Sequence, residues 1–544
     1  MKNIIILGVL LLMLISCSNS KQNVDAIYKN ATMYTVDKDF SIAKVVVVND
    51  GKIAAVGGNE LLKDYSSENE IDLEGKYMYP GFIDAHCHFY GYSMNLRQVE
   101  LRGTKSFDEI IEKLKAWDAE NNAEWVVGRG WDQNDWPVKE FPDNSLLNDA
   151  FPDKPVFLRR IDGHAAIAND KALKLAKIDA NFKIEGGDVL IKNGKATGVL
   201  IDNGMVPIMD LIEDPQGDEA ISYLNQGEKN CFAVGLTSVV DAGLEFDQIK
   251  LIDQQQELGE LKMQVYAMLT PTADNIENFV EKGIYNTERL HVRSIKLYAD
   301  GALGSRGACL LEPYSDDPAN FGIIVTSEKD MRALAQKAFD KGYQVNTHAI
   351  GDSANRLMLR IYADILKGKN DRRWRIEHAQ VINYNDFDKF GEFNIVPAVN
   401  TTHATSDMYW AEDRLGPERI KGAYAYEQLL QQNGWLCNGS DFPVEEINPL
   451  YGFYAAVARK DFENYPAGGF EPENALTREE ALKAMTIWAA KSMFEENEKG
   501  SIEVGKNADL VVLEKDIMQI DIAETHAVKV LRTIVRGEPV FIKK

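Results

Sequence analysis

The sequence lacks the features of a disulfide scaffold and of a nucleic-acid-binding protein. Only five of its 544 residues are cysteines, with no CxxC pair and no regular spacing, which argues against a disulfide framework. It has 60 basic against 84 acidic residues, a formal net charge of −24, and no basic stripe offsets this balance. No internal repeat of fixed period is present either. We therefore expect no nucleic-acid partner and no electrostatic binding to anionic membranes.

Long apolar runs are also scarce, apart from one at the N-terminus. There, IIILGVLLLMLIS begins at Ile4, shortly after Lys2; it is too short to span a bilayer comfortably but has the length of a signal-peptide core. The run ends in LISC at Cys17, before the polar stretch SNSKQNVD, and resembles the lipobox of bacterial lipoproteins. This resemblance implies a signal peptide over residues 1–16, lipidation of Cys17, and a lipid anchor in the bacterial cell envelope, outside the cytoplasm. An uncleaved anchor or a plain secretory signal is the alternative.

The composition, 45% hydrophobic and 9% aromatic, supports a sizeable core. Residues 24–80 and 500–544 are both rich in β-branched and aromatic residues, and Asp50-Gly51 between two apolar runs predicts a hairpin. Neither end alone offers enough surface for a core of its own. The two ends are therefore predicted to form one composite β-sandwich.

The middle of the chain, residues 81–499, alternates short apolar strands with helical patterns, which favours parallel β/α units. A closed TIM (β/α)8 barrel needs eight strands, and eight candidates are present. The first ends near His88 and the second begins near Leu236, too far apart for one crossover helix, so an insertion at about 95–230 is expected to form a cap. The candidate strands are GFIDAH from 81, LTSVVDAG from 236, MQVYAML from 263, SIKLYADG from 294, YQVNTHAIG from 343, WRIEHAQ from 374, FNIVPAV from 393 and WLCNGSDFP from 435.

Metal-ligating side chains recur at the ends of these strands. His86 and His88 end the first strand, and residues i and i+2 of an extended chain point the same way. His348, His378 and Asp441 end the fifth, sixth and eighth strands. In a barrel, side chains at the C-terminal ends of the strands surround the active site. The pattern predicts a metal site, for which imidazole and carboxylate favour zinc, with iron, manganese or nickel as alternatives.

Lys296 lies on the fourth strand, between two of the ligand-bearing strands. A lysine in such a strand either points outward or needs a partner that allows its burial. Beside metal ions, an ammonium group is tolerated only if its charge is removed or inverted. Reaction with carbon dioxide would convert Lys296 into a carbamate able to bridge two cations.

This order of ligands, with the phrases PGFIDAHCH, IKLYADGALGSRGA, THAIGD and GSDFP, resembles the metal-dependent amidohydrolase superfamily, in particular its amidohydrolase 3 branch of N-substituted formamide deformylase-like proteins. The resemblance covers nearly the whole chain after residue 17. It implies a distorted barrel with two divalent ions, and it also suggests a homodimer. It assigns His86, His88 and Asp441 to one ion, His348 and His378 to the other, and carboxylated Lys296 to the bridge; a single ion remains the alternative.

The expected activity is hydrolysis of an amide-like, non-peptide carbon–nitrogen bond of a small molecule. A metal-bound water acidified towards neutral pH would supply the hydroxide nucleophile, and Asp441 would take its proton and return it to the leaving amine. Alternatives on the same site are a deaminase, a cyclic amidase, an N-acyl amino-acid deacylase, or a lactone or phosphoester hydrolase. A catalytically silent, lipid-anchored binding protein is the alternative from another class.

Several further residues are weighed between a role in the site and a structural one. His164 could contact the substrate or its tetrahedral intermediate, and Glu377 is expected to orient His378. Trp131 in an apolar pocket and His403 after the seventh strand are candidates for substrate contact. Asp300 and Arg306, in the loop after Lys296, could orient either Lys296 or the substrate.

Overall fold

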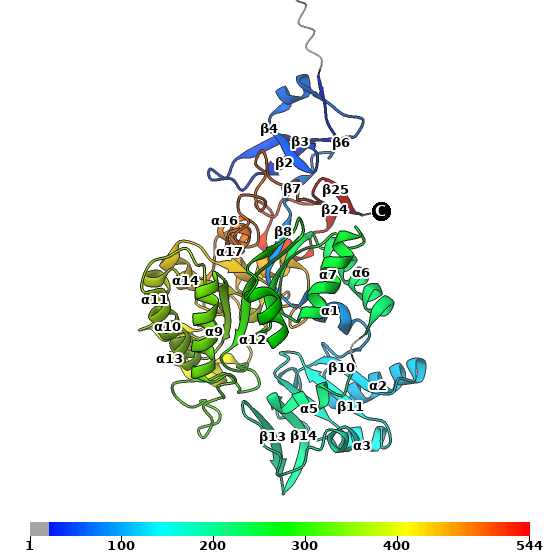
Figure 1. Cartoon of the computed structure of the whole chain (residues 1–544), viewed down its shortest axis with the longest axis vertical. Helices are drawn as coiled ribbons and strands as arrows, with labels where there is room; N and C mark the ends of the chain where they lie inside the picture. Colours follow the sequence, from blue (N-terminus) through cyan, green and yellow to red (C-terminus); the bar gives the residue numbers. More distant parts are fainter. Residues whose placement is uncertain (1–20, 214, 544) are drawn as a thin grey trace, which may run out of the picture.

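The computed structural model describes residues 21–213 and 215–543. The predicted signal peptide and Cys17 lie outside these residues. Three bodies follow one another along the long axis in Figure 1: a β-rich body at the top, a barrel in the middle and a second β-rich body below. Within the described ranges, every helix is too short or too polar to cross a lipid bilayer.

The central body confirms the predicted order of eight parallel strands. Each pairs with the next along the chain, and a short antiparallel strand is added at the fourth. The first and last strands meet where Asp441 N donates to His86 O at 2.7 Å, so the barrel is nearly closed. The strands are β8 (Phe82–Cys87), β15 (Leu236–Leu244), β16 (Gln264–Leu269), β18 (Leu290–Tyr298), β19 (Gln344–Ala349), β20 (Arg375–His378), β21 (Val396–Val399) and β22 (Cys437–Asn438).

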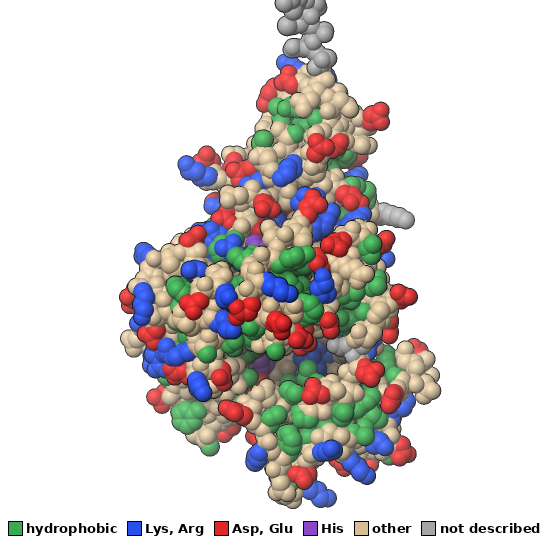
Figure 2. All heavy atoms as spheres, in the orientation of Figure 1, with side chains coloured by type: hydrophobic (Ala, Val, Ile, Leu, Met, Phe, Trp, Pro, Cys, Tyr) green, Lys and Arg blue, Asp and Glu red, His purple; other side chains and the backbone are tan. Residues whose placement is uncertain are grey.

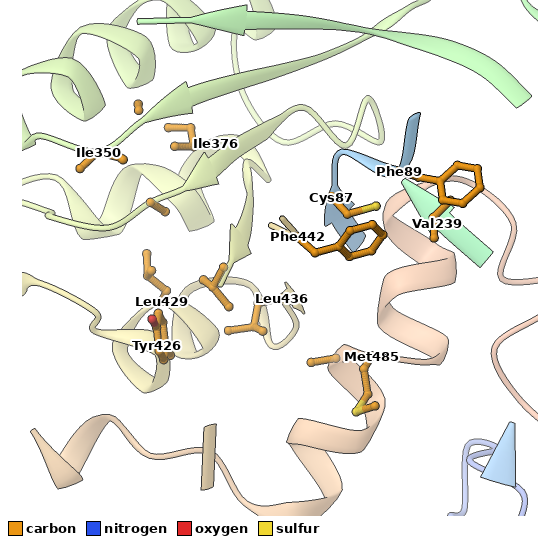
Figure 3. Packing of buried hydrophobic residues seen from close by; sticks show 14 of the residues in the cluster. Cys87, Phe89, Val239, Ile350, Ile376, Tyr426, Leu429, Leu436, Phe442 and Met485 are labelled. Carbon is orange, nitrogen blue, oxygen red and sulfur yellow. The ribbon is translucent and has the colours of Figure 1, made fainter. Parts of the chain in front are cut away.

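Helices surround this barrel because their apolar faces pack on the strands. Helix α9 (Glu328–Lys341) is an example: the Ser327 side chain accepts a hydrogen bond from Asp330 N, and Gly342 ends the helix in the left-handed region. Figure 3 shows part of the resulting core, with Cys87 and Phe442 near each other. The principal helices are α6 (Gly217–Ala233), α7 (Phe246–Glu257), α9 (Glu328–Lys341), α10 (Asp352–Leu366), α11 (Phe387–Phe393), α14 (Tyr426–Asn433), α16 (Arg478–Ala484) and α17 (Ile487–Ser492).

The two ends of the chain share one sheet, in the order β25-β24-β23-β7-β2-β3-β4. They join where β23 pairs with β7 in antiparallel register, Leu510 opposite Pro80. The hairpin predicted at Asp50-Gly51 is present, and both turn residues have positive φ, 51° and 71°. The strands are β2 (Ala26–Tyr34), β3 (Ile42–Asn49), β4 (Lys52–Gly57), β7 (Tyr77–Pro80), β23 (Leu510–Leu513), β24 (Val530–Val535) and β25 (Glu538–Ile542).

Residues between β8 and β15 form the lower body, a sheet in the order β13-β14-β12-β11-β10-β9 with its own apolar cluster. Helix α2 (Phe107–Asn121) packs on this cluster through Ile110 and Leu114. The insertion therefore folds around a core that is separate from that of the barrel. Its strands are β9 (Val99–Glu100), β10 (Val126–Trp131), β11 (Val156–Arg160), β12 (Ala165–Ala168), β13 (Gly187–Lys192) and β14 (Lys195–Asp202).

Candidate metal centre

The structure brings together the six residues that the sequence singles out on five different strands. His88 Nε2 lies 3.2 Å from Asp441 Oδ1, and His86 Nε2 lies 3.5 Å from the same oxygen. Lys296 Nζ lies 3.4 Å from His86 Nε2. The rings of His348 and His378 are 4.5 Å apart. All are buried except His88, which is partly exposed.

Each imidazole is held through one nitrogen, which leaves the other available as a ligand. Nδ1 of His86 pairs with Glu377, and Nδ1 of His88 lies 2.9 Å from Ala242 O. Nδ1 of His378 lies 2.9 Å from Asn400 Oδ1. His348 instead uses Nε2, which lies 3.3 Å from Gly301 O.

Glu377 is not placed as predicted: it pairs with His86 on β8 rather than orienting His378. Consecutive strand residues point to opposite faces, so Glu377 cannot share the direction of His378. Arg375 holds the carboxylate with two hydrogen bonds of 2.7 Å and donates to Ala85 O at 2.7 Å. Burial opposes ionisation, but the charges of Arg375 and His86 lower the pKa of Glu377 to about 2.

Glu377→Gln is expected to destabilise the protein by about 3–5 kcal/mol, because the Arg375 charge stays buried without a compensating carboxylate. The folded-state pKa of Glu377, about 2, lies below its ordinary 4.5, so this stabilisation is present above pH 4.5 and is lost as pH falls towards 2. Urea unfolding at pH 7 measures it. Glu288→Gln, in the exposed pair with Arg536, should cost at most about 1 kcal/mol; equal losses in the two variants would contradict the role given to Glu377.

The electrostatics of the cluster favour metal ligation. Burial lowers the pKa values of His348 and His378 well below the usual range, so both imidazoles are neutral. Burial raises the pKa of Asp441, but hydrogen bonds from His403 and His86 outweigh it and hold that pKa well below its usual range. Asp441 Oδ1 is buried without a well-aligned hydrogen bond. Neutral imidazoles around an ionised carboxylate are what a divalent cation requires.

Lys296 has the surroundings that its predicted modification needs. Burial lowers the pKa of Lys296 to about 8. A much larger share of the amine is therefore unprotonated at neutral pH than in an exposed lysine, and only the unprotonated amine can react with carbon dioxide. The residue is 1% exposed, which excludes the outward-pointing alternative.

A cavity of about 550 Å³ lies between the barrel and the insertion and reaches these ligands. Figure 2 shows a hollow between the two bodies, with histidine and basic side chains visible inside it. His164 lines the cavity; its Nδ1 lies 2.6 Å from Asp202 Oδ1, and its ring is 4.9 Å from that of His348. The insertion thus contributes side chains to the same cavity as the barrel.

His403 also lines the cavity and belongs to the ligand cluster itself. Its Nε2 lies 3.5 Å from Asp441 Oδ2, and its donor atoms group with those of His378 and Asp441. Nδ1 lies 3.0 Å from Glu445 Oε1. Although burial lowers it, hydrogen bonds to Asp441 and Glu445 raise the pKa of His403 to about 10.

Two predicted substrate contacts are wrong in position. Trp131 is fully buried in the core of the insertion, where its Nε1 donates to Leu158 O at 2.8 Å, so no face of it is left for a ligand. Arg306 pairs with Asp316, at 2.9 Å, and is not among the residues lining the cavity.

Asp300 lines the cavity, but its carboxylate is committed to the backbone. It accepts hydrogen bonds from the N–H groups of Cys309, Ile350 and Gly351. Oδ1 lies 3.6 Å from His348 Nε2. Asp300 therefore fixes the loop beside His348 rather than contacting Lys296.

The sequence did not predict which residues hydrogen-bond to the histidines of the site, except for Glu377, which was assigned to the wrong histidine. The signal for Arg375 was a charged residue inside a predicted barrel strand, the same signal that singled out Lys296. No pattern in the sequence links the other supporting residues to the histidines they contact, because the partners come from distant segments. These residues are Asp202, Asn400 and Glu445.

Comparison with known proteins gives a consistent result. Residues 69–541 match the amidohydrolase family described by the Amidohydro_3 profile. The chain is 32% identical to Protein LONG AFTER FAR-RED 3 of Arabidopsis thaliana, over 95% of this chain and 91% of that protein. It is 26% identical to N-substituted formamide deformylase of Arthrobacter pascens, over 94% and 97%. An uncharacterized metal-dependent hydrolase from Pyrococcus horikoshii OT3 superposes with a TM-score of 0.75 and 28% identity, covering 92% of this chain and 99% of that one.

Proposed function

This chain belongs to the amidohydrolase family and is a metal-dependent hydrolase, and from that premise we propose that it hydrolyses an amide-like, non-peptide carbon–nitrogen bond of a small molecule. The single observation that carries this proposal is the buried cluster of histidines around ionised Asp441, in which His348 and His378 are neutral, opening into the cavity. The named activity of the Arthrobacter relative, a deformylase, supports the choice of bond.

The residues present fit two divalent ions, for which zinc is our proposal. His86, His88 and Asp441 would hold one; His348 and His378 would hold the other, and carboxylated Lys296 would bridge them. The Nε2 atoms of His86 and His88, which face Oδ1 of Asp441, and the ring of His378, which is held through Nδ1, support this assignment. When bound, the ions supply Lewis acidity and acidify a coordinated water.

The protein's own groups account for proton transfer and orientation. Asp441 is ionised and lies close to His86 of one ligand set and His378 of the other, so we propose that it takes the proton of the attacking water and returns it to the leaving amine. The carboxylate of Asp202 fixes the ring of His164, whose other nitrogen can donate to the oxyanion that forms. The insertion acts as a cap that carries His164 over the barrel.

Metal removal tests this function. We expect the metal-loaded protein to hydrolyse members of a panel of N-formyl and N-acyl amines, to lose this activity on dialysis against a chelator, and to regain it with zinc. Product release and metal content, measured by mass spectrometry, are followed together. Absence of turnover with both sites loaded would favour the silent binding protein, and ammonia release from amidines or nucleobases would favour a deaminase.

We also keep as proposals the lipid anchor on Cys17 outside the cytoplasm, and a homodimer. The sequence around Cys17 supports the anchor. Incorporation of labelled palmitate into the native protein, and its loss in Cys17→Ser, would test it. Light scattering of the soluble form would test the dimer.

A further inference from the structure

Two arginines of the insertion, Arg129 and Arg159, line the cavity of the proposed reaction site but have no role in the proposed reaction. Arg129 on β10 and Arg159 on β11 lie opposite each other in the parallel register of the two strands. Both line the cavity that also contains Lys296, His348 and Asp441. Two guanidinium groups side by side in one wall of a site form an anion-binding surface.

Arg129 is the more informative of the two because its charge is buried and incompletely used. The side chain is 8% exposed; its Nη2 donates to Ile161 O at 3.0 Å, and its Nε has no hydrogen-bond partner. Among the described residues, no carboxylate pairs with Arg129. An uncompensated buried cation is costly, so a site of this kind is expected to be completed by an anion.

The two guanidinium groups converge beside the residues that would act on the substrate. A Cβ atom on Gly163 would lie 3.4 Å from Arg159 Nη2 and 3.5 Å from Arg129 Nη1. Gly163 directly precedes His164. An anionic group held by Arg129 would therefore place the rest of a small molecule between the insertion and the ligand cluster.

Neighbouring Arg160 shows the contrast. It is also buried, but its charge is matched by Asp132 and by Asp162, the latter at 2.6 Å. Burial, followed by the nearby charge of Arg159, lowers the pKa of Arg129 to about 9, which still leaves the group protonated at neutral pH. The cavity thus contains a guanidinium group that no described carboxylate contacts; the charges of Asp441 and Asp162 favour its protonated form without pairing with it.

We propose that Arg129, with Arg159 beside it, binds an anionic oxygen group of the substrate, a carboxylate or a phosphate. The substrate class is then an amide whose acyl or amine part carries a negative charge, as in N-acyl amino acids. This inference rests on the proposed hydrolase function and adds the feature by which substrates are selected.

The test compares matched substrates on the metal-loaded full-length protein. The panel contains N-acetyl and N-formyl amino acids, their C-terminal carboxamides, and the corresponding aminophosphonates. For Arg129→Gln we expect kcat/KM to fall about 10- to 100-fold on the anionic members, since a hydrogen bond to a charged group contributes that much, and to change less than about twofold on carboxamides. Arg129→Lys should recover part of the loss.

Arg332→Gln is the matched control, because Arg332 pairs with Glu328 and Asp364 on the outer surface of α9. It should leave both substrate classes unchanged. The relative loss on carboxylate and phosphonate members identifies which anion is preferred. An equal loss on charged and neutral members in Arg129→Gln, or a wild-type preference for carboxamides, would overturn the proposal.

Direct binding separates failure of this inference from failure of the proposed function. In calorimetry, the metal-loaded wild type should bind N-acetyl amino acids with a Kd about tenfold or more below that of their carboxamides. Arg129→Gln should abolish this difference in affinity. If this difference is found without turnover of any panel member, the anion site stands and the hydrolase function fails. If the two bind equally, the anion site fails whatever the turnover.

Discussion

We expect Asp441→Asn to remove turnover almost completely while the fold remains. Asp441 follows β22 with a positive φ of 63° and contacts His86, His88 and His403. Asparagine has nearly the same shape but cannot accept a proton. We expect kcat to fall by about 10²- to 10⁴-fold from the loss of the acid/base group, and further if an ion is lost with the charge.

Pre-steady-state product release with fully loaded metal sites measures this effect. Metal content is determined on the same sample, so that loss of acid/base catalysis and loss of an ion can be told apart. Asp364→Asn is the control, because that carboxylate is exposed and pairs with Arg332 on the outer surface. Activity within about tenfold of the wild type in metal-loaded Asp441→Asn would exclude Asp441 as the acid/base group.

The second large effect concerns Lys296. Lys296→Met keeps the length and apolar stem of the side chain but cannot form a carbamate. We expect it to bind at most one of the two proposed ions and to lose most activity. Apo wild type should reload its second ion faster with added bicarbonate, because carbon dioxide supplies the carboxyl group; the variant should not respond.

Metal content per chain and the intact mass under non-denaturing conditions provide the measurements for Lys296. A carbamate adds the mass of carbon dioxide and is lost in acid. Lys337→Met, on the exposed face of α9, is the matched control and should bind both ions. Two ions in Lys296→Met, with bicarbonate having no effect on the wild type, would rule out the bridging role and leave Lys296 as a buried amine beside the site.

The barrel could be predicted because its signals are local. Apolar strands of period two, and a histidine or aspartate at a strand end, are properties of a few consecutive residues. Parallel order then places all such ends on one rim without further information. For this reason the structure shows His86, His88, Lys296, His348, His378 and Asp441 in one cluster.

The errors concern side chains whose direction depends on packing. The sequence around Trp131 is compatible with a pocket wall or with core packing. In the structure, Trp131 belongs to the apolar core of the insertion. Arg306 was close to Lys296 in sequence, but its loop turns it outward to Asp316. Glu377 was assigned to its chain neighbour His378, although neighbours on a strand face opposite ways.

The sequence by itself predicted the strand order and singled out six candidate ligands, with Lys296 as the one whose charge a metal site would have to remove, because these predictions follow from residue type and period. Only the tertiary structure decided which groups complete the site. Glu377 and Arg375 support His86, Asp202 supports His164, and His403 joins Asp441 across segments that no local pattern connects. The role proposed for Arg129 could be inferred only once the fold placed it in the cavity opposite the barrel, because a buried charge without a contacting carboxylate is recognised only from its neighbours in space.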